Sequence, residues 1–210
     1  VRMAYVAGTL YAIMPAILLA TINARYIHTA FGLHYLRANL GPLREQSAIV
    51  EFTLGMSVDV MAERLLEGEP RIIGLGVYIW NQEPMTRLVR LLKAIAPDLV
   101  VVIGGPEVSH EWREQAIVQA ADYLISGEAD VAFAELCDQI LRGSPPQARV
   151  IHAALPDLQQ LCWPYAEYRD EDLAQRILYV EASRGCPFRC AFCLSALDKT
   201  SRAFPLSEFL

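Results

Sequence analysis

Short apolar runs alternate with amphipathic stretches over most of this chain, and this alternation limits its fold more than any other feature. Runs rich in Val, Ile and Leu are typical of strands that are buried on both faces of a parallel sheet. The stretches between them carry apolar residues three or four positions apart, which is the spacing of one helix face. We therefore expect an α/β fold with a doubly wound parallel sheet. The predicted strands are 16–22, 47–52, 71–79, 99–105 and 122–126.

The ends of the predicted helices carry local signals. Ser57 is suited to accept the first backbone N–H groups of one helix, and Gly68 is suited to end it. Pro84 fits the first turn of the next helix, and Pro97 follows its end. A last helix ends at Gly143, where the alternation stops. The predicted helices are 28–40, 57–68, 84–97, 111–121 and 129–143.

Composition narrows the class of protein. Of 210 residues, 54% are hydrophobic and 20% are charged, which suits a globular α/β protein with a well-buried core. With a net charge of −6, the chain as a whole has no basic field that would favour nucleic acid or anionic lipid. The apolar stretch 4–22 is interrupted by Gly8 and Pro15, so we expect no membrane span there. Only Arg2 precedes it, which does not fit a secretion signal.

The pattern also predicts how the chain is divided. The segment after the last helix loses the alternation and collects prolines, as a connector between domains does, with one short strand at 150–153. A strand-like run at 176–183 then leads into a loop rich in cysteine. The predicted parts are a leader of undefined role (1–15), the α/β domain (16–142), the connector (143–175) and the start of a second domain (176–210).

Three cysteines, Cys186, Cys190 and Cys193, occupy eight positions of that loop. Thiolates are soft ligands that select zinc, copper(I) or iron–sulfur clusters. A structural zinc site has four ligands, and Cys162 or His152 is a candidate for the fourth. An iron–sulfur cubane on three thiolates keeps one iron open to a substrate or cofactor. In a reducing, cytoplasmic location, cysteines grouped in this way are expected to bind a metal or a cluster in preference to forming disulfides.

The spacing C-x-x-x-C-x-x-C, with Phe192 before the last cysteine and a strand and Arg-Gly before the first, resembles the radical S-adenosylmethionine (SAM) signature. The resemblance implies that Cys186, Cys190 and Cys193 hold a [4Fe–4S] cluster whose open iron binds SAM. It also implies that Phe192 lies near the SAM adenine and that a (β/α) barrel begins here. Reductive cleavage of SAM to a 5′-deoxyadenosyl radical then requires an electron donor such as flavodoxin or ferredoxin.

The loops at the carboxyl ends of the predicted strands are where doubly wound sheets bind ligands. A Gly-Gly pair in one of them lets a flat ligand approach the backbone closely. No G-x-G-x-x-G follows the first strand and no Walker lysine is present, which disfavours those two kinds of nucleotide site. The segments VVIGGPEVS and ADYLISGEADVAFAEL resemble the flavodoxin-like or Rossmann-like cobalamin-binding domain of one radical SAM branch. By this resemblance the cobalamin contacts are Asn23, Tyr26, His28, Trp80, Asn81, Gly104, Gly105, Gly127 and Glu128.

This sequence differs from many cobalamin enzymes in one motif, D-x-H-x-x-G, which places a histidine beneath cobalt in those enzymes. Here Tyr26 stands two residues before His28, and Phe31 stands three residues after it, so the motif is absent. We interpret His28 as a helix-start residue in preference to a cobalt ligand. Trp80 and Asn81 fit a corrin contact and a core or rim position equally well.

The resulting hypothesis is the N-terminal portion of a cobalamin-dependent radical SAM enzyme. It acts by methyl transfer or by rearrangement on an unknown substrate, for which a small molecule is a candidate, and we expect no nucleic-acid or membrane partner. A radical SAM methylthiotransferase carries three further cysteines in its front domain, whereas residues 1–136 contain none, and Cys137 fits a buried position on a helix. Two alternatives stay open: a flavodoxin-like binding module with a structural zinc, and a cobalamin fold that binds no corrin. Because a (β/α) barrel needs about two hundred residues, we expect the chain by itself to be inactive.

Overall fold

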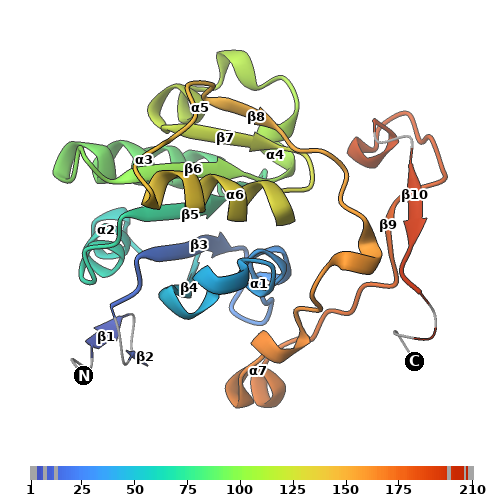
Figure 1. Ribbon diagram of the computed structural model, residues 1–210, viewed down its shortest axis with the longest axis horizontal. Helices are drawn as coiled ribbons and strands as arrows, with labels where there is room; N and C mark the ends of the chain where they lie inside the picture. Colours follow the sequence, from blue (N-terminus) through green and yellow to red (C-terminus); the bar gives the residue numbers. More distant parts are fainter. Residues whose placement is uncertain (1–3, 7–8, 12–13, 198–199, 206, 208–210) are drawn as a thin grey trace.

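The centre of the computed structural model is a parallel sheet with the strand order β4-β3-β5-β6-β7-β8 (Figure 1). The predicted doubly wound fold is confirmed, because β4 and β5 lie on opposite sides of β3 and the order then continues in one direction. The strands are β3 (Ile17–Asn23), β4 (Ser47–Thr53), β5 (Ile72–Gly76), β6 (Val100–Gly104), β7 (Tyr123–Ser126) and β8 (Val150–His152). The structure describes the whole chain except residues 1–3, 7–8, 12–13, 198–199, 206 and 208–210.

The sheet has six strands, whereas the sequence predicted five. The additional strand, β8, was expected as a short strand within the connector, but it pairs with β7 from Leu124↔Val150 to Ser126↔His152. A run of three residues is too short for its pattern to show where it pairs, and the open edge of β7 decides its place. The predicted connector therefore begins as part of the sheet.

Helices connect the strands on both faces of the sheet. Ser57 caps the helix α2 (Val58–Leu66) as predicted, since its side chain accepts the Val60 N–H at 3.4 Å. The predicted helix 111–121 is wrong in outline. Glu111, with a φ of +48°, lies outside helical geometry, and Gln115 is extended and separates a 3-10 turn at Trp112–Glu114 from a short helix at Ala116–Ala120. The helices are α1 (Phe31–Ala38), α2 (Val58–Leu66), α3 (Gln82–Ile95), α4 (Pro106–Ser109), α5 (Ala116–Ala120), α6 (Asp130–Leu141) and α7 (Asp170–Gln175). Short 3-10 helices span Gly41–Gln46, Trp112–Glu114, Leu158–Gln160, Tyr165–Glu167 and Leu194–Ala196.

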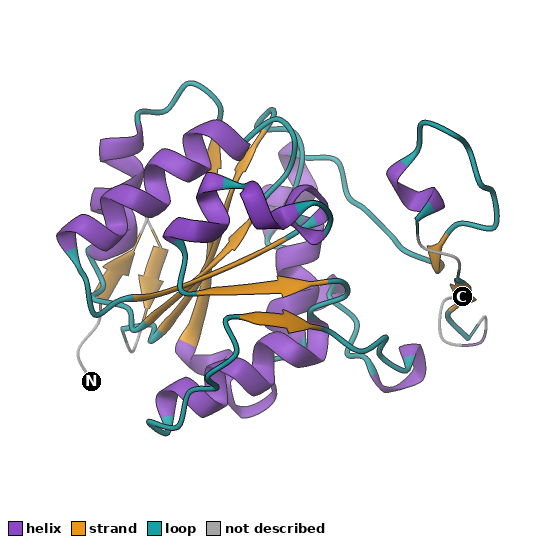
Figure 2. Ribbon diagram, turned by 90° about the horizontal axis from the view of Figure 1, so that it is seen from above, coloured by secondary structure: helices purple, strands orange, loops and turns teal. Residues whose placement is uncertain are grey.

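Helices cover both faces of the sheet (Figure 2), and each helix layer packs over its own apolar core. Helices α1 and α6 cover one face, where Phe133 belongs to the same buried cluster as Leu19. Helices α2, α3 and α5 cover the other face, where Leu88 belongs to the same cluster as Leu18. Every residue of β3 is buried, as expected for a mainly apolar strand between two helix layers. Its two polar side chains, Thr21 and Asn23, donate hydrogen bonds within the protein.

The chain after β8 runs along the side of the domain to α7 and then to a two-stranded hairpin (Figure 1). The predicted strand 176–183 is wrong: the structure has an isolated bridge between Ile177 and His28, and then β9 (Ser183–Gly185) antiparallel to β10 (Ser201–Ala203). In the part of the chain that is described, no strand lies beside residues 178–182 to pair with them. The start of a (β/α) barrel stays a prediction.

The predicted leader contains a small antiparallel pair, β1 (Ala4–Val6) and β2 (Thr9–Tyr11). Its strands are separate from the six-stranded sheet. No helix among the described residues is long and apolar enough to cross a membrane.

Candidate functional site

A cavity of about 540 Å³ lies at the carboxyl ends of β5, β6 and β7. The strand order reverses next to β5, and this is the edge at which doubly wound sheets bind ligands. The walls come from the sheet with its glycine turns, from α1 and α6, and from the stretch just before the first clustered cysteine. They include Tyr35, Gly104, Gly105, Glu128, Asp130 and Arg184.

Glycines keep one wall of this cavity at the level of the backbone. A Cβ at Gly105 would lie 2.4 Å from the Val77 carbonyl oxygen, and its φ of +117° strains any other residue. At Gly74 a Cβ would lie 2.8 Å from the Phe133 ring. Gly127, with a φ of +96°, also lines the cavity. The added atoms at Gly105 and Gly74 would collide with the protein itself, so the close packing of the strands and turns that line the cavity requires glycine there.

Tyr35, on α1, lines the cavity from one helix layer. The residue is 3% exposed, and its hydroxyl makes no well-formed hydrogen bond among the described residues, although the Glu181 carboxylate lies near enough to interact with it. Burial raises the pKa of the Tyr35 phenol above its usual range, and the Glu181 carboxylate adds to this shift. Buried polar groups rarely lack a partner, so this hydroxyl is suited to bond a ligand in the cavity.

Arg184 binds three carboxylates at the cavity wall. Its guanidinium donates to Asp130 at 2.7 and 3.1 Å, to Glu128 at 2.9 Å and to Glu181 at 3.0 Å. It also lies over the Tyr35 ring, 4.5 Å from the centroid. The predicted Glu128 is therefore a wall residue whose carboxylate is bound by arginine.

A second cavity, of about 380 Å³, adjoins the first and shares Tyr78 with it. The predicted His28 and Trp80 line this cavity beyond the ends of β3 and β5. His28 Nδ1 lies 2.5 Å from the Tyr179 hydroxyl oxygen. Trp80 stacks on Tyr78 with ring centroids 4.6 Å apart, and its Nε1 donates to the Ile22 carbonyl at 3.0 Å.

Three of the predicted contact residues are engaged within the protein. Asn81 is wholly buried, and its amide donates to backbone carbonyls of β3 and β5 at 3.1 and 3.2 Å. Asn23 lines the second cavity, but its amide donates to Glu51 at 2.5 Å. The Tyr26 hydroxyl donates to Glu171 of α7. These side chains hold the loops around the two cavities in place.

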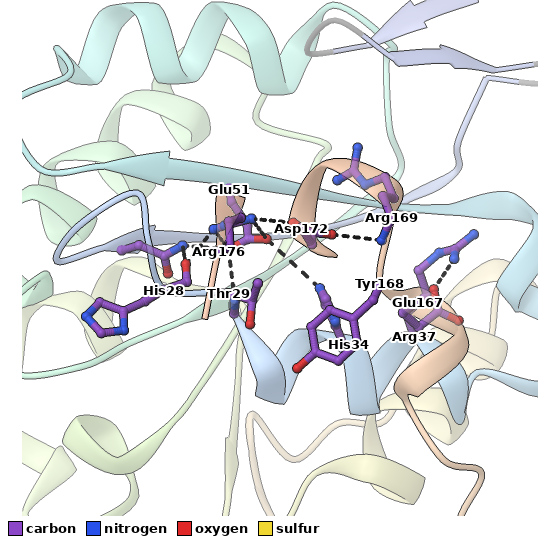
Figure 3. A network of polar contacts seen from close by, with 12 residues as sticks. His28, Thr29, His34, Arg37, Glu51, Glu167, Tyr168, Arg169, Asp172 and Arg176 are labelled. Carbon is purple, nitrogen blue, oxygen red and sulfur yellow. Dashed lines mark hydrogen bonds and ion pairs between the residues drawn. The ribbon is translucent and has the colours of Figure 1, made fainter. Parts of the chain in front are cut away.

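A buried ion cluster fastens the connector to the sheet domain (Figure 3). Arg176 donates to Glu51 of β4 at 2.8 and 2.9 Å and to Asp172 of α7 at 3.0 Å, and all three side chains are between 6% and 8% exposed. His34 Nε2 lies 4.0 Å from the Glu51 carboxylate, and burial lowers the pKa of His34. Another carboxylate of the connector, Glu167, is bound by two arginines of the sheet domain.

The three clustered cysteines lie on the loop between β9 and β10. Cys186 is half-buried, Cys190 and Cys193 are exposed, and all are free thiols. The Cys193 N–H donates to the Cys190 carbonyl at 3.2 Å, which forms a turn between them. Within the described residues, no three His, Cys, Asp or Glu side chains are grouped to hold a metal ion. Neither the predicted cluster nor a zinc site completed by Cys162 or His152 is therefore preassembled.

Two further residues of the sequence analysis have clear positions. Phe192, the predicted neighbour of the SAM adenine, is 97% exposed on the cysteine loop. Cys137, on α6, is wholly buried, and burial raises the pKa of its thiol to about 12. This position matches its interpretation as a small buried residue.

The sequence alone does not point to several residues that shape the site. Arg184 has one signal in the sequence, which is its position two residues before Cys186. Gly74 has another, because glycine inside a strand indicates that a ligand or another part of the protein approaches the backbone closely. Tyr35 gives none that separates it from other apolar positions of a helix. Its role depends on which side chains the fold brings beside it.

Comparison with known proteins identifies the family of the sheet domain. The profile of the B12 binding domain matches residues 17–137. The 2-(S-pantetheinyl)-carbapenam-3-carboxylate methyltransferase of Streptantibioticus cattleyicolor is 31% identical over 150 residues, which cover 60% of this chain and 22% of the relative. The cobalamin-dependent radical SAM methyltransferase TokK of Streptomyces tokunonensis is 30% identical over 177 residues, 70% of this chain and 25% of the relative.

A solved structure agrees with the fold. The cobalamin-dependent S-adenosylmethionine radical enzyme OxsB aligns with a TM-score of 0.60 and 16% identity over 86% of this chain and 28% of that chain. This chain spans about a quarter of the length of the two curated relatives. The resemblance inferred from the sequence is thereby confirmed for the sheet domain. The chain belongs to the B12-binding domain family.

Proposed function

We propose that this chain is the cobalamin-binding front part of a radical SAM enzyme and that its cysteine loop holds a [4Fe–4S] cluster. One observation carries the proposal. A single cavity is lined both by the glycine turns of the B12-binding domain and by the three residues just before Cys186, which are Ser183, Arg184 and Gly185. A cofactor in this cavity and a cluster on the loop would thus share one wall. The relative TokK, named for both cobalamin and radical SAM, supports this pairing.

The residues around the two cavities fit cobalamin. Gly104 and Gly105 line the cavity with backbone alone, against which a flat group can lie. The Tyr35 hydroxyl can hydrogen-bond an amide or phosphate of the cofactor. The stacked pair of Tyr78 and Trp80 offers an apolar surface beside the second cavity. Cobalamin, when bound, supplies a methyl carrier or assists a rearrangement. The protein residues bind and orient it and exclude water.

The cysteine loop fits an iron–sulfur cluster by its donor chemistry. Cys186, Cys190 and Cys193 are free thiols on one loop, and soft thiolates favour such clusters. The exposed Phe192 ring beside Cys193 is free to stack on the SAM adenine. A cluster with one open iron supplies single electrons to bound SAM. The proposed donor of these electrons is a flavodoxin or ferredoxin.

The proposed reaction is methyl transfer, because the curated relatives are named methyltransferases. A rearrangement is the second candidate. The proposed substrate is a small molecule, in keeping with the acidic net charge of −6.

Retention of cobalamin tests the first half of the proposal. The chain is mixed with hydroxocobalamin, passed over a desalting column, and measured by visible absorbance and by titration. We expect the wild type to retain the cofactor and Tyr35→Phe to bind it about fivefold more weakly, the value of one hydrogen bond. Tyr123→Phe is the matched control, because its hydroxyl donates to the Pro146 carbonyl at 3.0 Å outside the cavity. A wild type that elutes without cobalamin would refute the proposal.

Anaerobic reconstitution with iron and sulfide tests the second half. We expect a brown protein whose cluster gives an EPR signal after reduction by dithionite, and whose colour is lost when Cys186, Cys190 and Cys193 are replaced by Ala. Cys162→Ala, at an exposed cysteine of the connector, is the control and should leave the cluster intact. A colourless protein with one equivalent of zinc would instead establish the structural zinc module.

A further inference from the structure

The cysteine loop is closed at its base by a hairpin with an unusual charge pattern. Strands β9 and β10 flank residues 186–200, and their register places Arg202 directly opposite Arg184. Like charges directly opposite each other on neighbouring strands destabilise the pair. This hairpin therefore needs opposite charges from outside its own two strands.

The sheet domain supplies these charges. One carboxylate, Glu128, accepts from both arginines, from Arg184 at 2.9 Å through one oxygen and from Arg202 through the other. Asp130, the first residue of α6, accepts from Arg184 through both oxygens. The Arg184 side chain is only 10% exposed, so its pairs are shielded from solvent and screened little by salt.

The same residues form part of the cofactor cavity. Glu128, Asp130 and Arg184 all line it, and the guanidinium of Arg184 covers the Tyr35 ring. These paired charges at the base of the cysteine loop are called the clamp below. A ligand in the cavity would thus contact the clamp. Only one residue, Gly185, separates Arg184 from Cys186, the first thiolate ligand proposed above.

We infer that Arg184 is a positioning residue that couples occupation of the cobalamin cavity to the ordering of the cysteine loop. The inference rests on the proposed function, because it assumes that cobalamin is the occupant of the cavity. Arg184 acts through Glu128 and Asp130 and does not take part in the chemistry itself. If cofactor binding shifts the clamp towards its ordered state, then by linkage the ordered clamp binds the cofactor more tightly than the disordered one, by the same factor.

Hydrogen exchange of the cofactor-free protein tests the positioning. We compare Arg184→Gln with Arg176→Gln, a matched change at another buried arginine that binds carboxylates but lies outside the 540 Å³ cavity. We expect Arg184→Gln to speed exchange of backbone amides 182–186 about tenfold, and Arg176→Gln to speed exchange only around α7. Equal exchange of 182–186 in the wild type and Arg184→Gln would overturn the positioning role, and a thermal melt verifies that both variants fold.

Exchange with and without saturating cyanocobalamin tests the coupling. We expect cofactor binding to slow exchange of 182–186 in the wild type and in Arg176→Gln by about tenfold, within the usual range of coupling between sites. Arg184→Gln should bind cobalamin about tenfold more weakly and show little slowing. Arg184→Lys keeps the charge without the planar fork and should give an intermediate result.

The outcomes separate this inference from the proposed function. If the wild type binds cobalamin but the exchange of 182–186 is unchanged, the coupling is wrong and the proposed cofactor stands. The coupling is also wrong if Arg184→Gln shows the full slowing of the wild type. If the wild type binds no cobalamin, the proposed function and the coupling both fail, while the cofactor-free comparison still decides whether Arg184 positions the loop.

Discussion

The sheet domain and the segment from α7 to β10 are held in place by different forces. In the sheet domain, two apolar cores cover both faces, and every residue of β3 is buried. In the later segment, apolar residues such as Leu173 and Val180 are 59% and 70% exposed, and arginine–carboxylate pairs join it to the sheet domain. A small apolar cluster adds to these pairs by packing Phe204, just after β10, with Tyr35 of α1. The first region is stabilised by area removed from water, and the second by a few directional contacts.

From this difference we expect a substitution to affect the whole sheet domain but only a local part of the outer segment. Loss of one apolar side chain from a cooperative core lowers the stability of the whole domain. Loss of one ion pair from the outer segment can release the part of the segment around that pair, because little apolar area holds it there. The cavity lies where the two regions meet, so its shape depends on both.

The largest effect is expected in the sheet core. Leu88→Ala on α3 removes a side chain that is 0% exposed and should lower the free energy of unfolding by about 2–5 kcal/mol. Ile95→Ala on the same helix, at a residue 58% exposed, is the control and should change it by less than about 0.5 kcal/mol. Urea unfolding followed by circular dichroism measures both. Equal effects at the two positions would contradict the description of this core.

The next effect separates the two regions most clearly. Arg176→Gln leaves Glu51 and Asp172 without their buried partner, which costs about 3 kcal/mol if the segment stays docked. We expect local undocking of α7, with the Arg184 pairs still in place, to limit that loss. Protease cleavage near α7 should therefore accelerate much more than urea unfolding of the sheet shifts. Arg142→Gln, at an exposed pair with Asp138, is the control for a surface ion pair. An equal loss in both measurements would show that the two regions unfold as one unit.

A smaller effect is expected at the glycine wall. Gly105→Ala brings a Cβ to 2.4 Å from the Val77 carbonyl oxygen at a φ of +117°, and we expect it to cost about 2 kcal/mol or more. Gly143→Ala, at a φ of +76° with nothing within 4 Å of the added Cβ, should cost about 1 kcal/mol. Thermal melts of the two variants give the difference. A larger loss at Gly143 would mean that Gly105 is under less strain than its contacts indicate.

The smallest effect concerns pH. Because burial holds the pKa of His34 below its ordinary value of about 6.5, the unfolded state takes up a proton before the folded state does. The folded state should therefore lose stability as the pH falls below about 6.5. The carboxylates of Glu51, Asp172 and Glu167 reduce this shift without reversing it.

His34→Gln removes that titration, so the urea midpoint of this variant should depend less steeply on pH between about 7 and 5 than that of the wild type. His152→Gln, at an exposed histidine of β8, serves as the control. Parallel pH profiles for the wild type and His34→Gln would contradict the prediction.

The strands β3 to β7 could be predicted from the sequence because burial between two helix layers demands continuous apolar runs. The same reasoning failed at 176–183, whose apolar residues resemble a strand but lie exposed, with Val180 at 70%. The glycine turns of the cavity were also predictable in part, since Gly-Gly after a strand indicates a close approach. The internal roles of Asn23 and Asn81 were not, because an amide that bonds a ligand and one that bonds the backbone look the same in sequence.

By itself, the sequence determined the doubly wound sheet and the presence of three soft ligands on one loop. Periodicity and ligand type are local properties, and both can be read from neighbouring residues. Only the tertiary structure decided that Arg184 meets Asp130, 54 residues earlier, at the wall of the cavity. The partner of a buried charge is set by which segments pack together, and the separation of two residues along the chain does not reveal that.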